Sequence, residues 1–144
     1  MPHSILCVCL GNICRSPSGQ GALERAMPGA MIDSAGTSNW HIGDPPYGPM
    51  QAAARAQGLD IGQQQARQVR AEDFTRFDLI LAMDAQNLAD LKAMQPQGAT
   101  ARLALFLEVL EDGPGDVPDP YYTRDFDGVL ALIDRAAQAW AERL

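Results

Sequence analysis

A cysteine and an arginine lie near the start of the chain, on either side of a short loop in the stretch CLGNICRSPSG. Cys9 ends an apolar run, Gly11 follows it, and Arg15 comes just before a stretch of helical pattern. Only the thiolate form of cysteine is a nucleophile, and about 3% of a free thiol is thiolate at neutral pH. The charge of Arg15, the dipole of the following helix and the N–H groups of a glycine-containing loop each favour an anion. The stretch therefore predicts an oxyanion site beside an activated sulfur.

The three cysteines have other possible interpretations, but each explains fewer of these sequence features than an oxyanion site does. Cys7 lies inside the apolar run, where a cysteine is usually a small buried hydrophobe. The loop is not a Walker-type phosphate loop, because no Gly-Lys-Ser/Thr follows it. The C-x-C-x4-C spacing is not an ordinary zinc pattern, so no metal is expected. A cysteine protease would need a histidine base such as His41, but nothing around Cys9 supports that interpretation.

A second stretch, DVPDPYY near the C-terminus, offers a proton donor. Asp119 lies between two prolines on a stiff loop that should reach the same edge of a sheet as Cys9. A thiolate that attacks a phosphate ester needs a general acid to protonate the leaving oxygen, and Asp119 can supply that proton. Asp-Pro is also common in ordinary turns. The residues alone therefore leave open which acid acts, and the alternatives are Asp116, Asp125 and Asp127.

Segments of strand-like and helical pattern alternate along the chain. We expect strands over residues 4–9, 30–37, 77–84 and 101–110, the last followed by a short helical turn. The expected helices cover residues 17–27, 49–57, 85–94 and 124–143, and the expected loops cover 40–49 and 111–122. Ser16 and Asp84 are the expected caps of the first and third helices, and Gly58 should end the second. Such alternation predicts a parallel sheet covered on both faces, with ligands bound where the strands end.

The bulk composition limits the function classes. The chain has 144 residues, which suits one domain over 1–144, and its net charge of −7 argues against nucleic acid or an anionic membrane as a partner. No apolar run is long enough to span a membrane, and the first residues do not resemble a secretion signal. All cysteines fall within residues 7–14, which is not a disulfide framework, so a reducing cytoplasm is the expected location.

Several stretches together resemble the low-molecular-weight protein tyrosine phosphatase family: VCLGNICRSP, DSAGTS, ARQ, FDLILAMD and DPYY. The resemblance runs from about residue 5 to residue 140 with little insertion. It implies a three-layer α/β/α fold with a four-stranded parallel sheet, of the phosphotyrosine phosphatase I-like type, and no cofactor. It implies a phosphotyrosine protein as the substrate, with a bacterial-type tyrosine kinase as one candidate, and a monomer or weak dimer.

The resemblance also implies a role for each catalytic residue. Cys9 would attack phosphorus and form a cysteinyl-phosphate. Arg15 and the backbone amides of residues 10–15 would hold the oxygens of the transferred group. Asp119 would protonate the leaving phenol and then activate the water that hydrolyses the intermediate.

Further residues are assigned by the same resemblance. Ser16 would hydrogen-bond Cys9, and Asn12 would hold the loop in shape with support from Ser34. His41 and Tyr47 lie in the loop where this family sets its substrate preference. The expected substrate-binding residues are Leu10, Gly11, Asn12, Ile13, Cys14, Ser16, Trp40, Tyr121 and Tyr122.

The sequence departs from the family pattern at three places. Gly19 and Gln20 stand where Ala-Glu is usual, and Gln64 stands where many relatives carry a histidine that helps to hold the loop asparagine. The segment after GDPP reads YGPM, which changes the charge expected at the rim. An amide can donate and accept, so the loop network can survive the change at Gln64.

Two other functions and one further role stay open at this stage. An arsenate reductase shares the Cys-x5-Arg loop, but its thioredoxin-coupled form needs later cysteines, and none follows Cys14 here. A catalytically silent phosphate-binding module is the other alternative. Cys14 could capture an oxidised Cys9 as a disulfide and so protect it, or it could be a small residue of the pocket wall.

Overall fold

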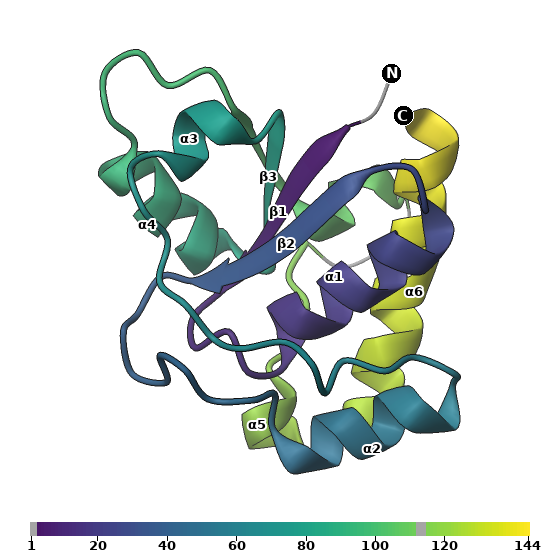
Figure 1. Cartoon of the computed structure of the whole chain (residues 1–144). Helices are drawn as coiled ribbons and strands as arrows, with labels where there is room; N and C mark the ends of the chain where they lie inside the picture. Colours follow the sequence, from purple (N-terminus) through teal and green to yellow (C-terminus); the bar gives the residue numbers. More distant parts are fainter. Residues whose placement is uncertain (1–2, 112–114) are drawn as a thin grey trace.

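The computed structural model describes residues 3–111 and 115–144, and within them a four-stranded sheet carries helices on both faces (Figure 1). The strands are β1 (Ser4–Cys9), β2 (Met31–Gly36), β3 (Leu79–Ala82) and β4 (Arg102–Leu105). The helices are α1 (Arg15–Ala26), α2 (Gly48–Ala56), α3 (Asp73–Arg76), α4 (Ala85–Met94), α5 (Pro120–Thr123), α6 (Phe126–Arg143) and a 3-10 turn, η1 (Phe106–Val109). Within these described residues, no helix is both long and apolar enough to cross a membrane.

The order of the strands places a crevice at the end of β1. The sheet has the order β2-β1-β3-β4, and every pairing is parallel. From β1 the chain passes to β2 on one side of β1, and it later forms β3 on the other side. The connections that follow β1 and β3 therefore lead to opposite faces of the sheet. Ligands in open parallel sheets bind at such a switch point, beyond the carboxyl ends of the strands. Cys9 ends β1 at this crevice, as the sequence predicted.

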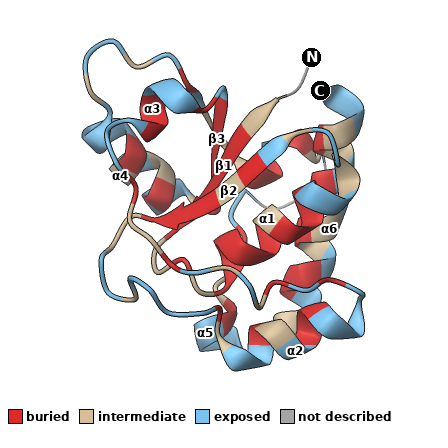
Figure 2. Cartoon of the chain, in the orientation of Figure 1, coloured by how far each residue is buried: buried red, intermediate tan, exposed pale blue. Residues whose placement is uncertain are grey.

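Alternate residues of the central strand supply two separate cores. Ile5 and Cys7 belong to the cluster packed under α1, α2 and α6, whereas Leu6 and Val8 belong to the cluster under α3 and α4. Figure 2 shows both central strands as mostly buried. A strand buried on both faces reads as a continuous apolar run, which is what residues 4–9 show. The three-layer α/β/α architecture predicted from the sequence is confirmed.

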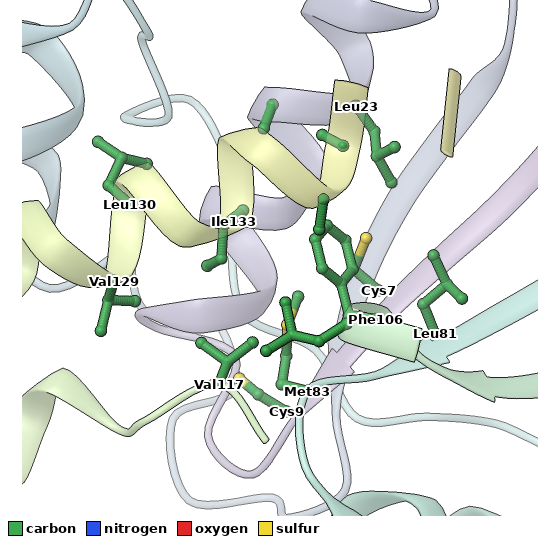
Figure 3. Packing of buried hydrophobic residues seen from close by; sticks show 14 of the residues in the cluster. Cys7, Cys9, Leu23, Leu81, Met83, Phe106, Val117, Val129, Leu130 and Ile133 are labelled. Atoms are coloured by element: carbon green, nitrogen blue, oxygen red, sulfur yellow. The ribbon is translucent and has the colours of Figure 1, made fainter. Parts of the chain in front are cut away.

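The departure at Gly19 has a packing explanation. A Cβ atom built at Gly19 would lie 2.6 Å from Met83 Cε and 3.3 Å from Cys7 Sγ, so α1 approaches the sheet more closely than a larger residue would allow. Figure 3 shows the side chains of Met83, Phe106 and Cys7 near one another. Cys7 is fully buried, as predicted, and that burial raises the pKa of its thiol.

The first helix begins earlier than the sequence suggested. Helix α1 starts at Arg15 rather than at residue 17, its N-cap is Cys14, and Ser16 makes no capping hydrogen bond to the helix. The prediction of Ser16 as N-cap was wrong because its hydroxyl is used inside the loop network described below. Asp84 does cap α4, where its carboxylate accepts a hydrogen bond from the N–H of Asn87.

Other boundaries differ by a few residues. The fourth strand is confined to 102–105, and the expected helical turn follows it as η1. The last helix begins at 126 rather than 124, because Asp125 caps it through the N–H of Gly128. The short helices α3 and α5 were not predicted, and α5 occupies the end of the expected loop 111–122. Residues 112–114 of that loop lie outside the described residues.

The two tryptophans provide a matched test of the core. Trp140 is buried, and its indole N–H donates to the carbonyl of Phe106 at 2.7 Å, whereas Trp40 is 68% exposed. Trp140→Phe leaves a cavity and an unpaired carbonyl, so it should lower the free energy of unfolding by about 2 kcal/mol. Trp40→Phe should change that free energy by less than about 0.5 kcal/mol. Urea unfolding followed by circular dichroism measures both, and equal losses would contradict the assignment of Trp140 to the core.

Candidate active site

A pocket of about 240 Å³ opens at the edge of the sheet where β1 ends. Its lining residues come from the loop after β1, from residues 40–41 and from the segment around α5. They are Cys9, Leu10, Gly11, Ile13, Cys14, Arg15, Trp40, His41, Asp119, Tyr121 and Tyr122. All three predicted catalytic residues are therefore brought together. Asn12 and Ser16, expected among the substrate-binding residues, and Ser34, expected to support the loop, are buried and do not line the pocket.

The loop after β1 is held from outside through its carbonyl groups. The carbonyl of Cys9 accepts from the N–H of Thr37 at 2.9 Å, and that of Leu10 accepts from the N–H of Ser38 at 3.0 Å. The DSAGTS segment can come this close because Gly36 has no side chain, since a Cβ there would lie 2.8 Å from the Leu10 oxygen. The carbonyl oxygens of Cys9 and Leu10 therefore bind neighbouring segments that do not line the pocket. The loop can then offer its N–H groups to an anion.

Asn12 lies at the centre of the loop's hydrogen-bond network. It is buried and has φ of 58°, a left-handed conformation that asparagine tolerates better than most residues. Its Oδ1 accepts from the backbone N–H of Arg67 at 3.0 Å. Its Nδ2 donates to Ser16 Oγ at 2.7 Å and to Ser34 Oγ at 3.0 Å. Since an N–H can only donate, Arg67 fixes which way round the amide lies.

The direction of these bonds determines what Ser16 does to Cys9. Ser16 Oγ already accepts from Asn12, so its single proton is free to point elsewhere. Cys9 Sγ lies 3.0 Å from Ser16 Oγ, a shorter distance than the 3.4 Å to the carbonyl of Ala35. The N–H of Asn12 donates to the same sulfur at 3.2 Å. The sulfur of Cys9 is thus surrounded by donors, which suits a thiolate.

Gln64 completes the network at its far side. Ser34 Oγ donates to Gln64 Oε1 at 3.3 Å, and Gln64 Nε2 donates to the carbonyl of Pro17 at 3.0 Å. Gln64 therefore supports Asn12 through Ser34 and does not contact it directly. The Gln64 amide uses its acceptor oxygen and its donor nitrogen together.

Arg15 is fixed by partners that sequence reasoning did not identify. Its buried guanidinium donates through Nη1 to Asp84 Oδ2 at 2.7 Å and to the carbonyl of Val117 at 3.1 Å. Burial alone would lower the pKa of Arg15, but the Cys9 sulfur and the Asp84 carboxylate outweigh burial and raise it. Because Nη1 is fully used, the edge with Nε and Nη2 is left for an anion. Asp84 follows β3, and β3 pairs with β1. This position after a neighbouring strand was the only feature of the sequence that could have identified Asp84 as a partner of Arg15.

Asp119 lines the pocket from the segment that leads into α5. Its Oδ1 accepts from the N–H of Tyr121 at 3.0 Å, and its Oδ2 lies 3.6 Å from Arg15 Nη2. Its side chain is 28% exposed. The other candidate acids do not line the pocket: Asp116 accepts from the N–H of residue 85, Asp125 caps α6, and Asp127 lies in the first turn of α6.

Exposed rings form the rim of the pocket. Trp40 is 68% exposed, Tyr122 is 75% exposed, and both line the pocket. Tyr121 and Tyr122 pack edge to face with their ring centroids 5.4 Å apart. His41 also lines the pocket, and its Nδ1 lies 3.2 Å from Asp44 Oδ2. His41 was placed in the specificity loop by sequence but was not among the predicted site residues.

The described residues contain no group of three or more histidine, cysteine, aspartate or glutamate side chains that could hold a metal ion. The pocket instead offers a sulfur, a guanidinium and a carboxyl group. These groups can carry out nucleophilic displacement at a tetrahedral oxyanion, with a proton donor beside the leaving group.

Comparisons with known proteins agree with this chemistry. Residues 4–144 match the family described as low molecular weight phosphotyrosine protein phosphatase. The sequence is 42% identical to low molecular weight protein-tyrosine-phosphatase YfkJ of Bacillus subtilis, over 90% of this chain and 88% of that protein. The crystal structure of YfkJ superposes with a TM-score of 0.92 at 37% identity, covering 99% of this chain and 94% of YfkJ. The structure of Vibrio vulnificus Wzb in complex with benzylphosphonate gives a TM-score of 0.90 at 33% identity, covering 99% of each chain.

Deleting one hydroxyl of α1 tests the link between Ser16 and Cys9. Ser16→Ala should slow the alkylation of Cys9 by iodoacetamide at neutral pH about fivefold to tenfold, because the sulfur loses a charge-assisted hydrogen bond. Ser18→Ala is the matched control, since Ser18 Oγ donates to the carbonyl of Cys14 and not to Cys9. Mass spectrometry of the labelled peptide gives the rates. An equal rate in Ser16→Ala and in the unchanged protein would refute the link.

The second thiol of the loop should titrate much later than a free cysteine. Burial, with a smaller contribution from Cys9, raises the pKa of Cys14 to about 12. Its thiolate fraction should therefore rise about tenfold per pH unit from about pH 7 to about pH 10 without levelling off. The alkylation rate of Cys14, localised by tandem mass spectrometry, should follow that slope. A plateau above about pH 9 would mean that Cys14 behaves as an ordinary exposed thiol.

Proposed function

The chain belongs to the low-molecular-weight phosphotyrosine protein phosphatase family and is a protein-tyrosine phosphatase, and we propose that Cys9, Arg15 and Asp119 carry out its reaction. The observation that supports this assignment most is that one pocket is lined by all three side chains. Each has a partner that orients it: Ser16 for Cys9, Asp84 for Arg15, and the N–H of Tyr121 for Asp119.

In the first step the thiolate of Cys9 attacks the phosphorus of a phosphotyrosine ester. The sulfur–phosphorus bond forms as the bond to the phenolic oxygen breaks, and that oxygen takes a proton from Asp119. Asp119 Oδ2 is the proposed donor, because Oδ1 accepts from the N–H of Tyr121. The edge of Arg15 that carries Nε and Nη2 and the loop N–H groups bind the equatorial oxygens as their charge develops.

In the second step water releases the phosphate. Asp119, now a carboxylate, takes a proton from a water molecule that attacks phosphorus, and the sulfur–phosphorus bond breaks. Inorganic phosphate leaves, and Cys9 returns to its thiolate form. The reaction balances without a redox partner or a cofactor.

The rim supports an aryl ester as substrate. The phenyl ring of phosphotyrosine would lie between Trp40 on one side and Tyr121 and Tyr122 on the other, where offset or edge-to-face contacts are favourable. The Wzb structure in complex with benzylphosphonate, a phosphonate that carries an aromatic ring, agrees with this choice. We propose that the substrates are phosphotyrosine proteins in the cytoplasm, with a bacterial-type tyrosine kinase as one candidate, and that the enzyme acts as a monomer or weak dimer.

The alternative functions are less well supported. A thioredoxin-coupled arsenate reductase needs cysteines after the loop, and the sequence has none beyond Cys14. Arsenate-dependent consumption of thioredoxin would reveal that activity. A silent phosphate-binding module was suggested by the changes at Gln20 and Gln64, but the Gln64 amide takes part in a connected network that reaches Cys9 through Asn12.

The proposed general acid is tested by varying the leaving group. Cys9→Ser should abolish hydrolysis of p-nitrophenyl phosphate. Asp119→Asn keeps an oxygen for the N–H of Tyr121 but has no proton to give, so it should lower kcat/KM roughly a hundredfold or more for phenyl phosphate and only about tenfold for p-nitrophenyl phosphate. Steady-state kinetics with the two esters measure the ratio. Equal losses on both substrates would remove Asp119 as the acid.

A further inference from the structure

Arg124 occupies a backbone conformation that normally selects glycine. It ends α5 with φ of 64° and ψ of 11°, and its N–H donates to the carbonyl of Pro120 at 2.8 Å. A left-handed residue directly after a helix is usually glycine, because a Cβ atom is strained there. The strain must be offset by what the Arg124 side chain does.

The Arg124 guanidinium lies beside two aromatic rings that also contact each other, with their centroids 6.0 Å apart. Its guanidinium carbon is 5.4 Å from the ring centroid of Tyr47 and 5.0 Å from that of Phe126. Its Nη1 donates to the hydroxyl of Tyr47 at 3.1 Å and to the carbonyl of Tyr121 at 3.4 Å. A planar guanidinium that stacks and donates at once is well suited to this position, and a lysine reproduces only part of it.

Tyr47 connects this cluster to the loop that carries Cys9. Its backbone N–H donates to the carbonyl of Ile13 at 2.8 Å, and its ring centroid lies 5.3 Å from that of Tyr121. The N–H of Tyr121 in turn donates to Asp119 Oδ1. A continuous set of contacts therefore runs from Ile13 through Tyr47 and Arg124 to the proposed acid. It joins two halves of the pocket that are far apart in the sequence.

We propose that Arg124 is a positioning residue, which holds the segment with Asp119 against the loop with Cys9 by binding Tyr47. This proposal rests on the function proposed above and extends it. General acid catalysis requires the donor to lie within hydrogen-bond reach of the leaving oxygen, and a displacement of about 1 Å is costly. Arg124 does not line the pocket, so it acts through Asp119 and not on the substrate.

The central variant is Arg124→Gly, which relieves the backbone strain and removes the side chain. It should lower kcat/KM about fivefold to tenfold for phenyl phosphate and less than about twofold for p-nitrophenyl phosphate, because only the poorer leaving group depends strongly on a well-placed acid. Arg124→Lys should recover part of the loss. Tyr47→Leu should give the same pattern, and the double variant Arg124→Gly, Tyr47→Leu should lose less than the product of the single losses.

The controls separate position from charge and stability. Arg124→Gln and Arg55→Gln remove the same charge from exposed arginines, and only Arg124→Gln should change the leaving-group ratio. Thermal melts should show that Arg124→Gly stays folded, and if it does not, Arg124→Lys and Tyr47→Leu give the same test.

Three outcomes would overturn the proposal or its basis. A leaving-group ratio in Arg124→Gly equal to that of the unchanged protein refutes the positioning role, provided that Asp119→Asn alters the ratio. A rise in KM for acidic phosphopeptides without a change in the ratio refutes it in favour of direct substrate contact. Absence of turnover in the unchanged protein, or a ratio that Asp119→Asn leaves unaltered, would instead contradict the proposed function.

Discussion

The bond from the backbone N–H of Arg67 to Asn12 Oδ1 fixes the direction of the side-chain hydrogen bonds that lead from Asn12 through Ser16 to the sulfur of Cys9. Because the N–H can only donate, the amide of Asn12 must turn its NH₂ group toward Ser16 and Ser34. Ser16 then has its proton free for Cys9. Had the amide been reversed, its oxygen would have drawn that proton away from the sulfur. The hydrogen bond between Arg67 and Asn12, which lies outside the pocket, thus makes the Ser16 proton available to the Cys9 sulfur within it.

The residues that hold this arrangement are themselves bound by residues of the sheet, the helices and neighbouring loops. The guanidinium of Arg67 binds Asp33 of β2 and the buried Asp73 of α3, so the donor to Asn12 is held on two sides. On the other flank, Arg15 is tied to Asp84 and to the carbonyl of Val117, and the N–H of Val117 donates to the carbonyl of Met83. Figure 3 shows Val117, Met83 and Cys9 close together. Pre-organised groups of this kind stabilise charge without rearrangement during the reaction.

The sequence revealed local features and the loop of Asp119, and it missed side-chain pairs that join distant segments. Cys9 and Arg15 could be found because a strand end, a loop and a helix start lie within a few residues. The strand and helix pattern predicted the layers, since burial on two faces leaves a continuous apolar run. The pairing of Arg15 with Asp84 joins segments brought together only by the strand order, and no short-range pattern encodes it. Ser16 was misassigned as the N-cap of α1 for a different reason: its partners are local, but its hydroxyl is used by Asn12 and Cys9 within the loop and not by the helix.

Backbone strain marks the two sides of the pocket. Among the described residues, Asn12 and Arg124 are the only non-glycine residues with positive φ, and they flank the pocket from the Cys9 loop and from the α5 segment. Such conformations persist only where surrounding contacts over-determine them. Asn12 has three side-chain hydrogen bonds, and Arg124 has two rings and a tyrosine hydroxyl. Both residues hold a segment with little regular structure, a loop or a very short helix, at the place where the reacting groups must meet. The strain is therefore offset by contacts that also set the geometry of the reaction.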